Sequence, residues 1–590
     1  MSSYGSAGSF LAERDDELDP QNEDERLIDS KKVYQNSNND SSSNDKNSSS
    51  YNTCSVLMIF LFPALGGLLF GYDIGATSAV LTQLESKTYS GVQWTDQVNN
   101  SSFLRGTITS IGMFGALLGS TTCFAVADNL GRKRSLLLAS FLFCVGAIVD
   151  AISGNPNWDA TTGISVLLTG RLIYGYGCGF AMHGAPAYIG EMSPNSIRGL
   201  LVSMKEAFIV LGMVCGYSVG YGYSGVVGGW RATYAWASPV AVIMFVGITY
   251  LPYSARWLAL KGRINEARRS LKFVTPNIPE SEIQAIKEAA DKAAESMNDN
   301  TTLMGDFRRL TGPTIFPALV AGVGLVFLQQ VTGQPSVLYY ANTIFKDVGL
   351  NSLASVGVSV FKLIATLFAT FTVDNYGRKL LLYIGCTLML IALLMLGTTF
   401  LFDYMSASDC NEYVSTETCP IDSCAWSTTC NNDCDTSGYT NDDCVCCGTG
   451  GINSQKATIL VALFIYIGGY QVGFGPISWL IISEIFPLEV RGKAVSIAVV
   501  SNFFWNTVMT FFFPVELEFI GASATFYLYA CVLTWGIYFI YYRVPETKGL
   551  SLEQIEEFFI RSSSVLGTSN NNGGLPSKEK REEVKLVPEL

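Results

Sequence analysis

The chain has 590 residues, of which 49% are hydrophobic and 15% charged, with a formal net charge of −12. Apolar runs recur along most of its length, and the loops between them are too short to fold around one water-soluble core, which excludes an ordinary soluble protein. Much of the negative charge lies in the amino-terminal tail and one outer loop, so it does not indicate a nucleic-acid partner.

Twelve apolar runs are each long enough to cross the roughly 30 Å hydrocarbon core of a bilayer. They cover about residues 55–80, 104–127, 135–153, 163–187, 199–222, 231–252, 314–342, 352–373, 380–402, 457–482, 494–515 and 523–544. No basic region leads into the first run, so it is not a cleaved signal peptide. The pattern predicts an all-α, multi-pass membrane protein of twelve transmembrane helices.

The polar segments predict five parts along the chain. These are a disordered tail at 1–52, a six-helix bundle at 53–252, a helical linker at 253–312, a second six-helix bundle at 313–545 with a Cys-rich outer loop at 404–455, and a tail at 546–590. The first tail is rich in Ser, Asn and Asp, a composition that does not support a packed core.

Basic residues predict the orientation of the chain. They concentrate in alternate loops, at Arg132, Lys133, Arg134, Arg198, Arg256, Arg263, Arg268, Arg269, Arg378, Lys379, Arg491 and Lys493. Loops rich in Lys and Arg stay in the cytoplasm, so we expect both termini and the linker to be cytoplasmic.

Two motifs occur twice, each copy at a constant offset from the other. DNLGRKR at 128–134 returns as DNYGRK at 374–379, and GEMSPNSIRG at 190–199 returns as SEIFPLEVRG at 483–492. Such a repeat predicts two similar halves. The second offset is longer because the Cys-rich loop lies between the second copies.

That loop holds eight of the fifteen cysteines and no Lys or Arg. They are Cys410, Cys419, Cys424, Cys430, Cys434, Cys444, Cys446 and Cys447. We expect a disulfide-closed module on the outer side, with a zinc site as the alternative, although the loop contains no His. The pairing cannot be deduced, since eight cysteines allow 105 connectivities.

Polar side chains interrupt several apolar runs. Gln329, Gln330, Gln334, Tyr339 and Tyr340 lie in the seventh run, where Gln330 and Gln334 share a face. Polar groups within a span mark either a transport pathway or contacts between helices. A lone carboxylate there costs at least about 2.5–3.5 kcal/mol, so Asp73 and Arg171 are expected to pair or to carry protons.

The motifs together resemble the sugar porter family of the major facilitator superfamily over about residues 54–560. They include GGLLFGYDIG at 66–75, GRLIYGYGCGF at 170–180, QQVTGQPSVLYYA at 329–341, GPISWLIISEIFP at 475–487 and PETKG at 545–549. AMHGAPAYIGEM at 181–192 resembles plant-type vacuolar and plastid glucose transporters, often labelled xylose–proton symporter-like. PYSARW at 252–257, where the family usually has PESPRW, and the Cys-rich loop are departures.

The resemblance implies a sugar site at the centre of two six-helix bundles. Carried over by position, its residues are Phe70, Glu206, Gln329, Gln330, Tyr339, Trp479, Asn502 and Asn506, and the polar run adds Gln334 and Tyr340. Pro335 stands where an Asn is usual and would break the helix, and Phe503 stands where some members have Trp.

Charged residues within the spans carry the expected coupling to protons. In the family, an Asp at the Asp73 position marks proton symporters, and the Arg at the Arg171 position is its partner. The alternative is a fixed structural ion pair. Glu206 and Lys362 form a second acid–base pair that either meets across the halves or holds the sugar.

The repeated motifs predict a cytoplasmic gate. Its residues are Asp128, Arg132, Glu191 and Arg198 in the first half and Asp374, Arg378, Glu484 and Arg491 in the second. Opposite charges there would join the halves when the site faces outward and separate when it faces inward. The alternative is that the basic residues only set the topology.

We therefore expect a monosaccharide transporter for glucose or a xylose-like sugar, working by proton symport and alternating access. The alternatives are a passive hexose uniporter, a proton-coupled inositol carrier and, from another class, a sugar-sensing receptor. We expect no enzymatic activity, cofactor, metal or nucleic-acid partner, and function as a monomer. The plasma membrane and a vacuolar or endosomal membrane are both open.

Overall fold

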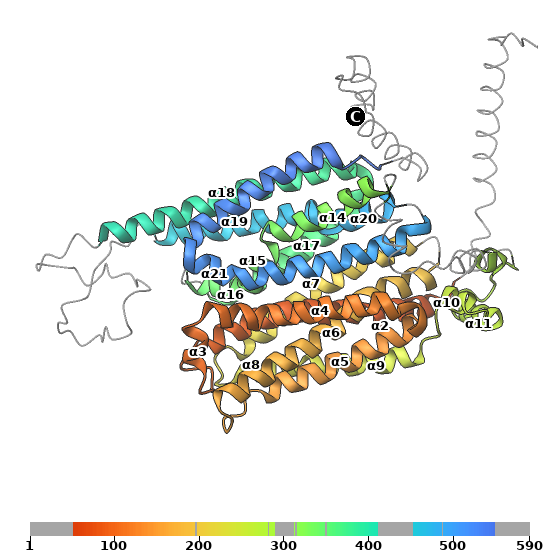
Figure 1. Ribbon diagram of the computed structural model, residues 1–590, viewed down its shortest axis with the longest axis horizontal. Coiled ribbons are helices and arrows are strands. Elements are labelled where there is room, and N and C mark those ends of the chain that lie inside the picture. The colour runs from red at the N-terminus through yellow and green to blue at the C-terminus, as the bar shows by residue number, and fades with distance from the viewer. Residues whose placement is uncertain are drawn as a thin grey trace, which may run out of the picture.

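The computed structural model describes residues 51–194, 197–280, 283–288, 312, 315–347, 351–410, 452–486 and 488–548. Within these ranges the chain forms α-helices and no β-strand. The long helices run side by side in two groups, one coloured red to yellow and the other green to blue (Figure 1). Residues 1–50 of the predicted first tail, residues 411–451 of the Cys-rich loop and the chain after 548 lie outside the described residues.

The first bundle contains the helices before the linker. They are α2 (Thr53–Leu84), α3 (Thr95–Asn99), α4 (Ser102–Leu130), α5 (Arg132–Ile152), α6 (Ala160–Met192), α7 (Arg198–Tyr223), α8 (Gly229–Ala235) and α9 (Ala237–Tyr250). The linker begins with α10 (Ala255–Leu260) and α11 (Ile264–Val274).

The second bundle contains shorter pieces as well as long helices. They are α14 (Phe316–Val331), α15 (Gln334–Tyr339), α16 (Ala341–Asp347), α17 (Leu353–Tyr376), α18 (Arg378–Cys410), α19 (Ile452–Val472), α20 (Phe474–Ile485) and α21 (Leu488–Arg543). The exact boundaries of the two predicted bundles stay a prediction.

Ten helices of the described chain are long and apolar enough to cross a membrane. Helix α6 is not among the ten, because Arg171 and many small or polar residues lower its hydropathy. The last candidate, Lys493–Arg543, contains two predicted spans, which meet where Gly521 leaves the helical conformation at φ 79°. Counting α6 and dividing α21 at Gly521 gives the twelve predicted helices.

Small residues allow the long helices to approach closely, which accounts for part of the high glycine content. A Cβ atom at Gly71 of α2 would lie 1.7 Å from the carbonyl oxygen of Ile209 in α7. One at Gly212 of α7 would lie 2.0 Å from the carbonyl oxygen of Leu68. Close backbone contact between small residues is a main source of helix association where lipid surrounds the protein.

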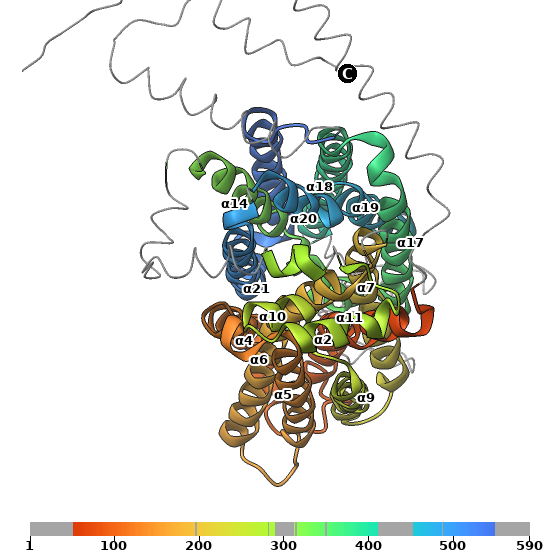
Figure 2. The ribbon, with the colours of Figure 1, turned by 90° about the vertical axis from the view of Figure 1, so that its right-hand side faces the viewer.

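The two ends of the molecule differ in the helices that lie at them. At the linker end are α10 and α11, where the Asn52 amide donates to the Val274 carbonyl at 2.8 Å. The opposite end, the far end, carries α3, α8 and α16 (Figure 1). Figure 2 faces the linker end and shows the two bundles as separate groups of helix ends. The halves meet where α4 packs on α21 and α7 packs on α17.

Several hydrogen bonds join the two halves toward the far end. Tyr340 and Thr109 lie 2.5 Å apart through their hydroxyl oxygens, and the Tyr217 hydroxyl donates to the Leu338 carbonyl at 2.5 Å. The backbone N–H of Asn342 donates to the Ser78 hydroxyl at 3.1 Å. The segment α15–α16 thus fastens the second half to α2, α4 and α7 at this end.

The seventh predicted span is broken, but not at the expected residue. Helix α14 ends before Thr332, and Gly333 adopts the left-handed conformation with φ 93°. Its α-carbon faces the Tyr529 ring, where a Cβ atom would lie 2.4 Å away. Pro335 lies in the first turn of α15, where the missing N–H would have no helical partner anyway. Gly333 therefore makes the break and Pro335 begins the next helix.

Candidate functional site

The structure brings Asp73 of α2 and Arg171 of α6 together as a buried ion pair. The Arg171 Nη1 donates to Asp73 Oδ1, and the two residues are 0% and 5% exposed. Room for the pair comes from α4, where a Cβ atom at Gly112 would lie 3.0 Å from Arg171 Nη2. The Tyr234 ring lies 5.5 Å from the guanidinium carbon. The predicted partners are thus in contact deep inside the first half.

A set of amide side chains occupies the second half. On α14, Gln329 accepts from Asn502 of α21 at 3.5 Å, and Gln330 accepts from Asn506 at 3.2 Å. Gln329 also donates to the Phe474 carbonyl at 3.2 Å. Amides both donate and accept, as sugar hydroxyls do, so a hydroxyl inserted between these partners can satisfy both.

The polar residues of α15, and Tyr340 directly after it, make different contacts. Tyr339 is fully buried, and its hydroxyl has no hydrogen-bond partner within the described chain. Gln334 is 7% exposed and begins α15. Tyr340 instead joins the halves through Thr109, and its hydroxyl also donates to the Thr510 carbonyl of its own half at 3.2 Å. Tyr340 therefore belongs to the far-end contact and not to the amide set.

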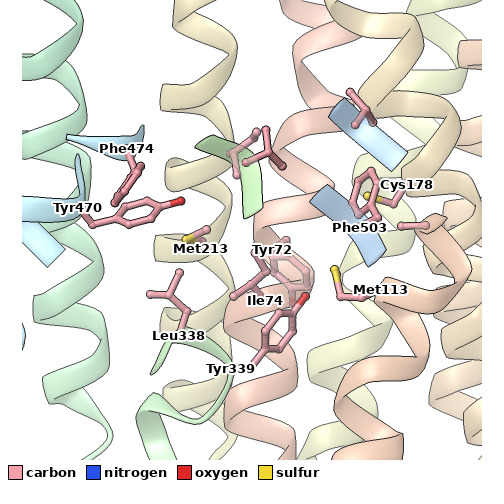
Figure 3. Packing of buried hydrophobic residues seen from close by; sticks show 14 of the residues in the cluster. Tyr72, Ile74, Met113, Cys178, Met213, Leu338, Tyr339, Tyr470, Phe474 and Phe503 are labelled. Atoms are coloured by element: carbon pink, nitrogen blue, oxygen red, sulfur yellow. The ribbon is translucent and has the colours of Figure 1, made fainter. Parts of the chain in front are cut away.

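Aromatic side chains line the region between the halves. The rings of Phe70 and Phe503 meet edge to face with centroids 6.1 Å apart. Trp479 is half-buried on α20 and packs against the same apolar core. Figure 3 shows this core, in which side chains of both halves are labelled: Tyr72, Ile74, Met113, Cys178, Met213, Leu338, Tyr339, Tyr470, Phe474 and Phe503. A sugar ring can stack on such surfaces.

Glu206 of α7 and Lys362 of α17 lie on helices that pack together across the halves. The two charges interact electrostatically, but no ion pair within 4.0 Å joins these two described side chains. Lys362 is 3% exposed, and its ammonium nitrogen lies 5.6 Å from the centre of the Tyr470 ring. The alternative that the pair meets directly is therefore not the arrangement seen here, and the alternative that it holds the sugar stays a prediction.

A small pocket lies elsewhere, between the two halves at the far end. It is lined by Tyr217, Val337, Leu338, Ala341, Ile344, Phe345, Ser355, Val358, Ser359, Leu463 and Ile467. Its lining is mostly apolar and includes none of the predicted sugar-site residues. A sugar needs more hydrogen-bonding groups than this lining offers, so we do not assign the pocket to substrate.

The repeated motifs form matching ion pairs at the linker end. Arg132 Nε donates to Glu191 at 3.0 Å in the first half, and Arg378 Nη2 donates to Glu484 at 3.1 Å in the second. Each pair lies within one half. Gly131 and Gly377, just before the two arginines, share a φ of 79°.

The remaining predicted gate residues are only partly described. Arg198 Nη2 donates to the Ser193 carbonyl at 3.4 Å. The side chains of Asp128, Asp374 and Arg491 lie outside the described part. So do those of the eight cysteines of the outer loop, while the seven cysteines that are described are free thiols.

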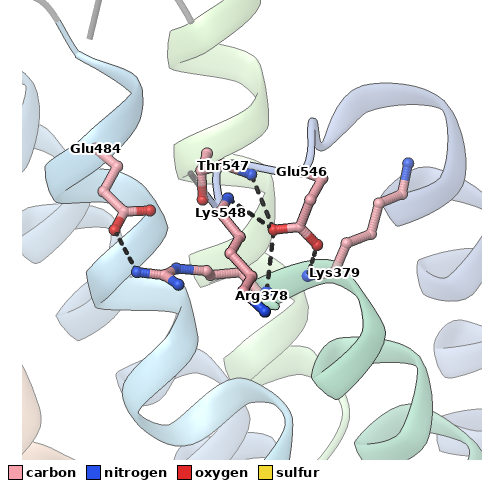
Figure 4. A network of polar contacts seen from close by, with 6 residues as sticks. All are labelled: Arg378, Lys379, Glu484, Glu546, Thr547 and Lys548. Carbon is pink, nitrogen blue, oxygen red and sulfur yellow. Dashed lines mark hydrogen bonds and ion pairs between the residues drawn. The ribbon is translucent and has the colours of Figure 1, made fainter. Parts of the chain in front are cut away.

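Figure 4 shows how the second pair is held in place. Glu546, from the PETKG motif, accepts hydrogen bonds from the backbone N–H groups of Arg378 and Lys379 at 3.1 and 3.0 Å. Its carboxylate therefore caps the N-terminus of α18. Lys379 Nζ donates to the Tyr541 carbonyl at 3.1 Å near the end of α21.

The first half replaces this carboxylate by an aromatic ring. Tyr253 occupies the position of the family's Glu in PYSARW, stacks on Trp257 and lies 5.0 Å from Lys133 Nζ. Lys133 still donates to the Leu251 carbonyl at 2.6 Å. The first half thus has a cation–π contact where the second half has a charged cap, and its lysine is still held in place.

Sequence reasoning missed two buried polar residues, Asp150 and Tyr470. Tyr470 lies beside Lys362, and nothing in its apolar run distinguished it from a packing residue. Asp150 is 1% exposed in α5 and could have been found, since it is a carboxylate inside a predicted span.

Comparisons with known proteins identify the family of the chain. Residues 59–419 and 439–559 match the family described as "Sugar (and other) transporter". The chain is 39% identical to D-xylose-proton symporter-like 2 of Arabidopsis thaliana, over 86% of this chain and 91% of the relative. It is 30% identical to the D-xylose transporter of Levilactobacillus brevis, over 84% and 94%, and to inositol transporter 4 of Arabidopsis thaliana, over 86% and 92%.

Solved structures show the same fold. The proton:xylose symporter XylE bound to 6-bromo-6-deoxy-D-glucose aligns with a TM-score of 0.64 at 27% identity, over 86% of this chain and 100% of that one. An inward-open form of XylE from E. coli aligns with a TM-score of 0.63 at 25% identity, over 85% and 99%. The prediction of a twelve-helix transporter, and not an enzyme, is confirmed. The chain belongs to the sugar transporter family of the major facilitator superfamily.

Proposed function

We propose that this protein moves a monosaccharide, xylose or a glucose-like sugar, together with a proton across a membrane. The observation that carries the proposal is the buried Asp73–Arg171 pair in the first half, together with the paired amides of α14 and α21 in the second. A buried carboxylate that exchanges its cation partner for a proton is the simplest proton carrier. The relatives named as proton symporters support the same coupling.

The sugar would take the place of the amide–amide hydrogen bonds. Gln329, Gln330, Asn502 and Asn506 already lie within 3.5 Å of one another in pairs. Sugar hydroxyls can accept from the asparagine amides and donate to the glutamine oxygens, while Phe70 or Trp479 covers the ring face. Tyr339, whose buried hydroxyl lacks a described partner, supplies one further donor.

Alternating access would use the contacts at the two ends. The far-end hydrogen bonds through Tyr340, Tyr217 and Asn342 close that end. The ion pairs at the linker end lie within single halves, which suits a state in which the halves separate there. We assign the linker end and both termini to the cytoplasm from the distribution of basic residues, and we assign a monomer as the working unit.

The energetics support uphill transport. One pH unit is worth about 1.4 kcal/mol, and a membrane potential of about 100 mV adds about 2.3 kcal/mol for each charge moved. One proton for each sugar could then sustain a gradient of roughly several hundredfold.

Purified protein in lipid vesicles tests the proposal. With an inward proton gradient, labelled xylose and glucose should accumulate above equilibrium, and a protonophore should collapse the accumulation. Competition with inositol then tests whether the protein carries polyols, an alternative that the similarity to inositol transporter 4 supports. Uptake that stops at equilibrium with or without the gradient would identify a passive uniporter instead.

A further inference from the structure

A second carboxylate lies beside the Asp73–Arg171 pair. Asp150 of α5 is 1% exposed, and its carboxyl group forms no hydrogen bond or ion pair within the described chain. A buried carboxylate without a partner is strongly destabilising, whereas the protonated form is not. The side chain is therefore neutral in this arrangement of the helices.

The packing of α5 on α6 makes room for this group next to Arg171. A Cβ atom at Gly170, the residue before Arg171, would lie 2.4 Å from Asp150 Oδ1. Asp150 interacts electrostatically with both Arg171 and Asp73. Tyr234 of α8 is the third ionisable neighbour. Arg171 and Asp73 are the charged groups of the described chain that act on the Asp150 carboxyl group.

The Arg171 guanidinium has hydrogen-bond donors that Asp73 does not use. Arg171 uses Nη1 for Asp73, while its buried Nε and Nη2 have no hydrogen-bond partner in the described residues. Asp150 Oδ1 is a buried acceptor that also lacks one. A guanidinium presents several donors in a fixed plane, so a small rotation can exchange one carboxylate for another.

Counting charges limits the states of this cluster. With both carboxyl groups ionised, Asp73, Asp150 and Arg171 sum to one negative charge in a buried site. With one proton bound, the sum is zero, and the proton can reside on either carboxyl group while Arg171 pairs with the other. Two carboxylates that share one cation titrate together, and the second negative charge strengthens proton binding.

We propose that Asp150 is a second proton-carrying carboxyl group of the coupling site, and that Arg171 exchanges Asp73 for Asp150 as the proton moves between them. In the step, the O–H bond of Asp150 breaks, an O–H bond forms on Asp73, and the Arg171 hydrogen bond passes from Asp73 to Asp150. The total charge stays zero, and no other reactant takes part. This inference rests on the proposed proton symport.

The pH dependence of transport tests the proposal. Initial xylose uptake is measured in vesicles at a fixed membrane potential over a range of external pH, for the parent, Asp150→Asn and Asp159→Asn. Without Asp150, the proton-free cluster is neutral and binds a proton more weakly. The half-maximal point should then move to more acidic pH by about one unit or more, a tenfold loss of proton affinity.

Asp159→Asn is the matched control. Asp159 is an exposed carboxylate that caps α6, a role that Asn also fills, so its curve should overlie that of the parent. An Asp150→Asn curve that overlies both would overturn the proposal. A parent whose uptake does not depend on pH would instead reject the proton symport itself.

Folding gives a second readout that does not need transport. Thermal stability in detergent is compared for Asp73→Asn, Asp150→Asn and the double variant. Each single variant leaves Arg171 one carboxylate and should stay folded, whereas the double variant leaves a buried cation alone and should lose most of its folded protein. A double variant as stable as the singles would contradict the exchange. An unfolded Asp150→Asn protein would show that Asp150 is ionised, which also overturns the proposal.

Discussion

The two halves of this protein repeat their ends but not their interiors. At the linker end each half forms an Arg–Glu pair from the same motif, at 3.0 and 3.1 Å. Inside, the first half buries charges, Asp73 with Arg171, and the second buries amides, Gln330 with Asn506. In our proposal the repeated part serves the movement of the two halves against each other. In our proposal the part that differs carries the chemistry, with the proton-coupling pair in the first half and the sugar-binding amides in the second.

The ends also show one difference within the repeat. Glu546 caps α18 in the second half, whereas Tyr253 lies over Lys133 in the first. Because Gly131 and Gly377 keep the same φ, the backbone at the start of α5 and α18 tolerates either arrangement. The motif therefore needs a fixed lysine and arginine more than it needs a particular cap.

The largest expected effect comes from removing the Asp73 carboxylate of the buried ion pair. Asp73→Asn should abolish uphill accumulation of sugar, since an amide of the same shape cannot exchange a proton. Sugar exchange without a gradient should continue, because the amides lie in the other half. Vesicle accumulation assays measure the first and equilibrium exchange the second. Accumulation at the parent's level would remove Asp73 from the coupling site.

The next effect concerns the amide interior. Gln330→Ala and Trp479→Ala should each weaken sugar affinity by about 0.5–3 kcal/mol, through a lost hydrogen bond or a lost stacking surface. Half-saturation in equilibrium exchange gives the value. Gln97→Ala and Trp236→Ala, at exposed positions, are the controls and should match the parent. If both site variants also match the parent, the sugar binds elsewhere.

A smaller effect on stability is expected at the linker end, where Glu546 of the second half is compared with Tyr253 of the first. Glu546→Ala removes a carboxylate that accepts two N–H groups of α18 and should lower stability by about 1–2 kcal/mol. Tyr253→Phe keeps the aromatic ring over Lys133 and should change little. Thermal unfolding in detergent compares them. Equal losses in the two variants would show that the hydroxyl of Tyr253 matters as much as the carboxylate.

The smallest effect is expected from the Cys-rich loop. Replacing about residues 408–450 by a short Gly/Ser linker should preserve transport and sugar preference, since long surface loops cost little free energy to shorten. Competition uptake with glucose, xylose, galactose and inositol, at matched surface expression, measures the preference. A changed sugar preference would show that the loop takes part in sugar recognition.

Much of this arrangement follows from patterns that a sequence displays. Apolar runs predicted the helices, and the repeated DNxGRK motif predicted two halves whose arginines turn out to form the same pair. The pairing of Asp73 with Arg171 was predictable because a charge inside a span needs a partner. Other features depend on contacts between distant helices. The break at Gly333 depends on the Tyr529 ring, and the cross-half role of Tyr340 depends on Thr109 in α4.

The central claim is that sugar and proton move together through this protein. The direct measurement is the external pH of a weakly buffered suspension of vesicles carrying the protein, followed while xylose or glucose is added without any other energy source. We predict alkalinisation of the medium that needs the sugar, saturates with it and disappears in Asp73→Asn. Sugar entry into the same vesicles with no change of external pH would contradict the account.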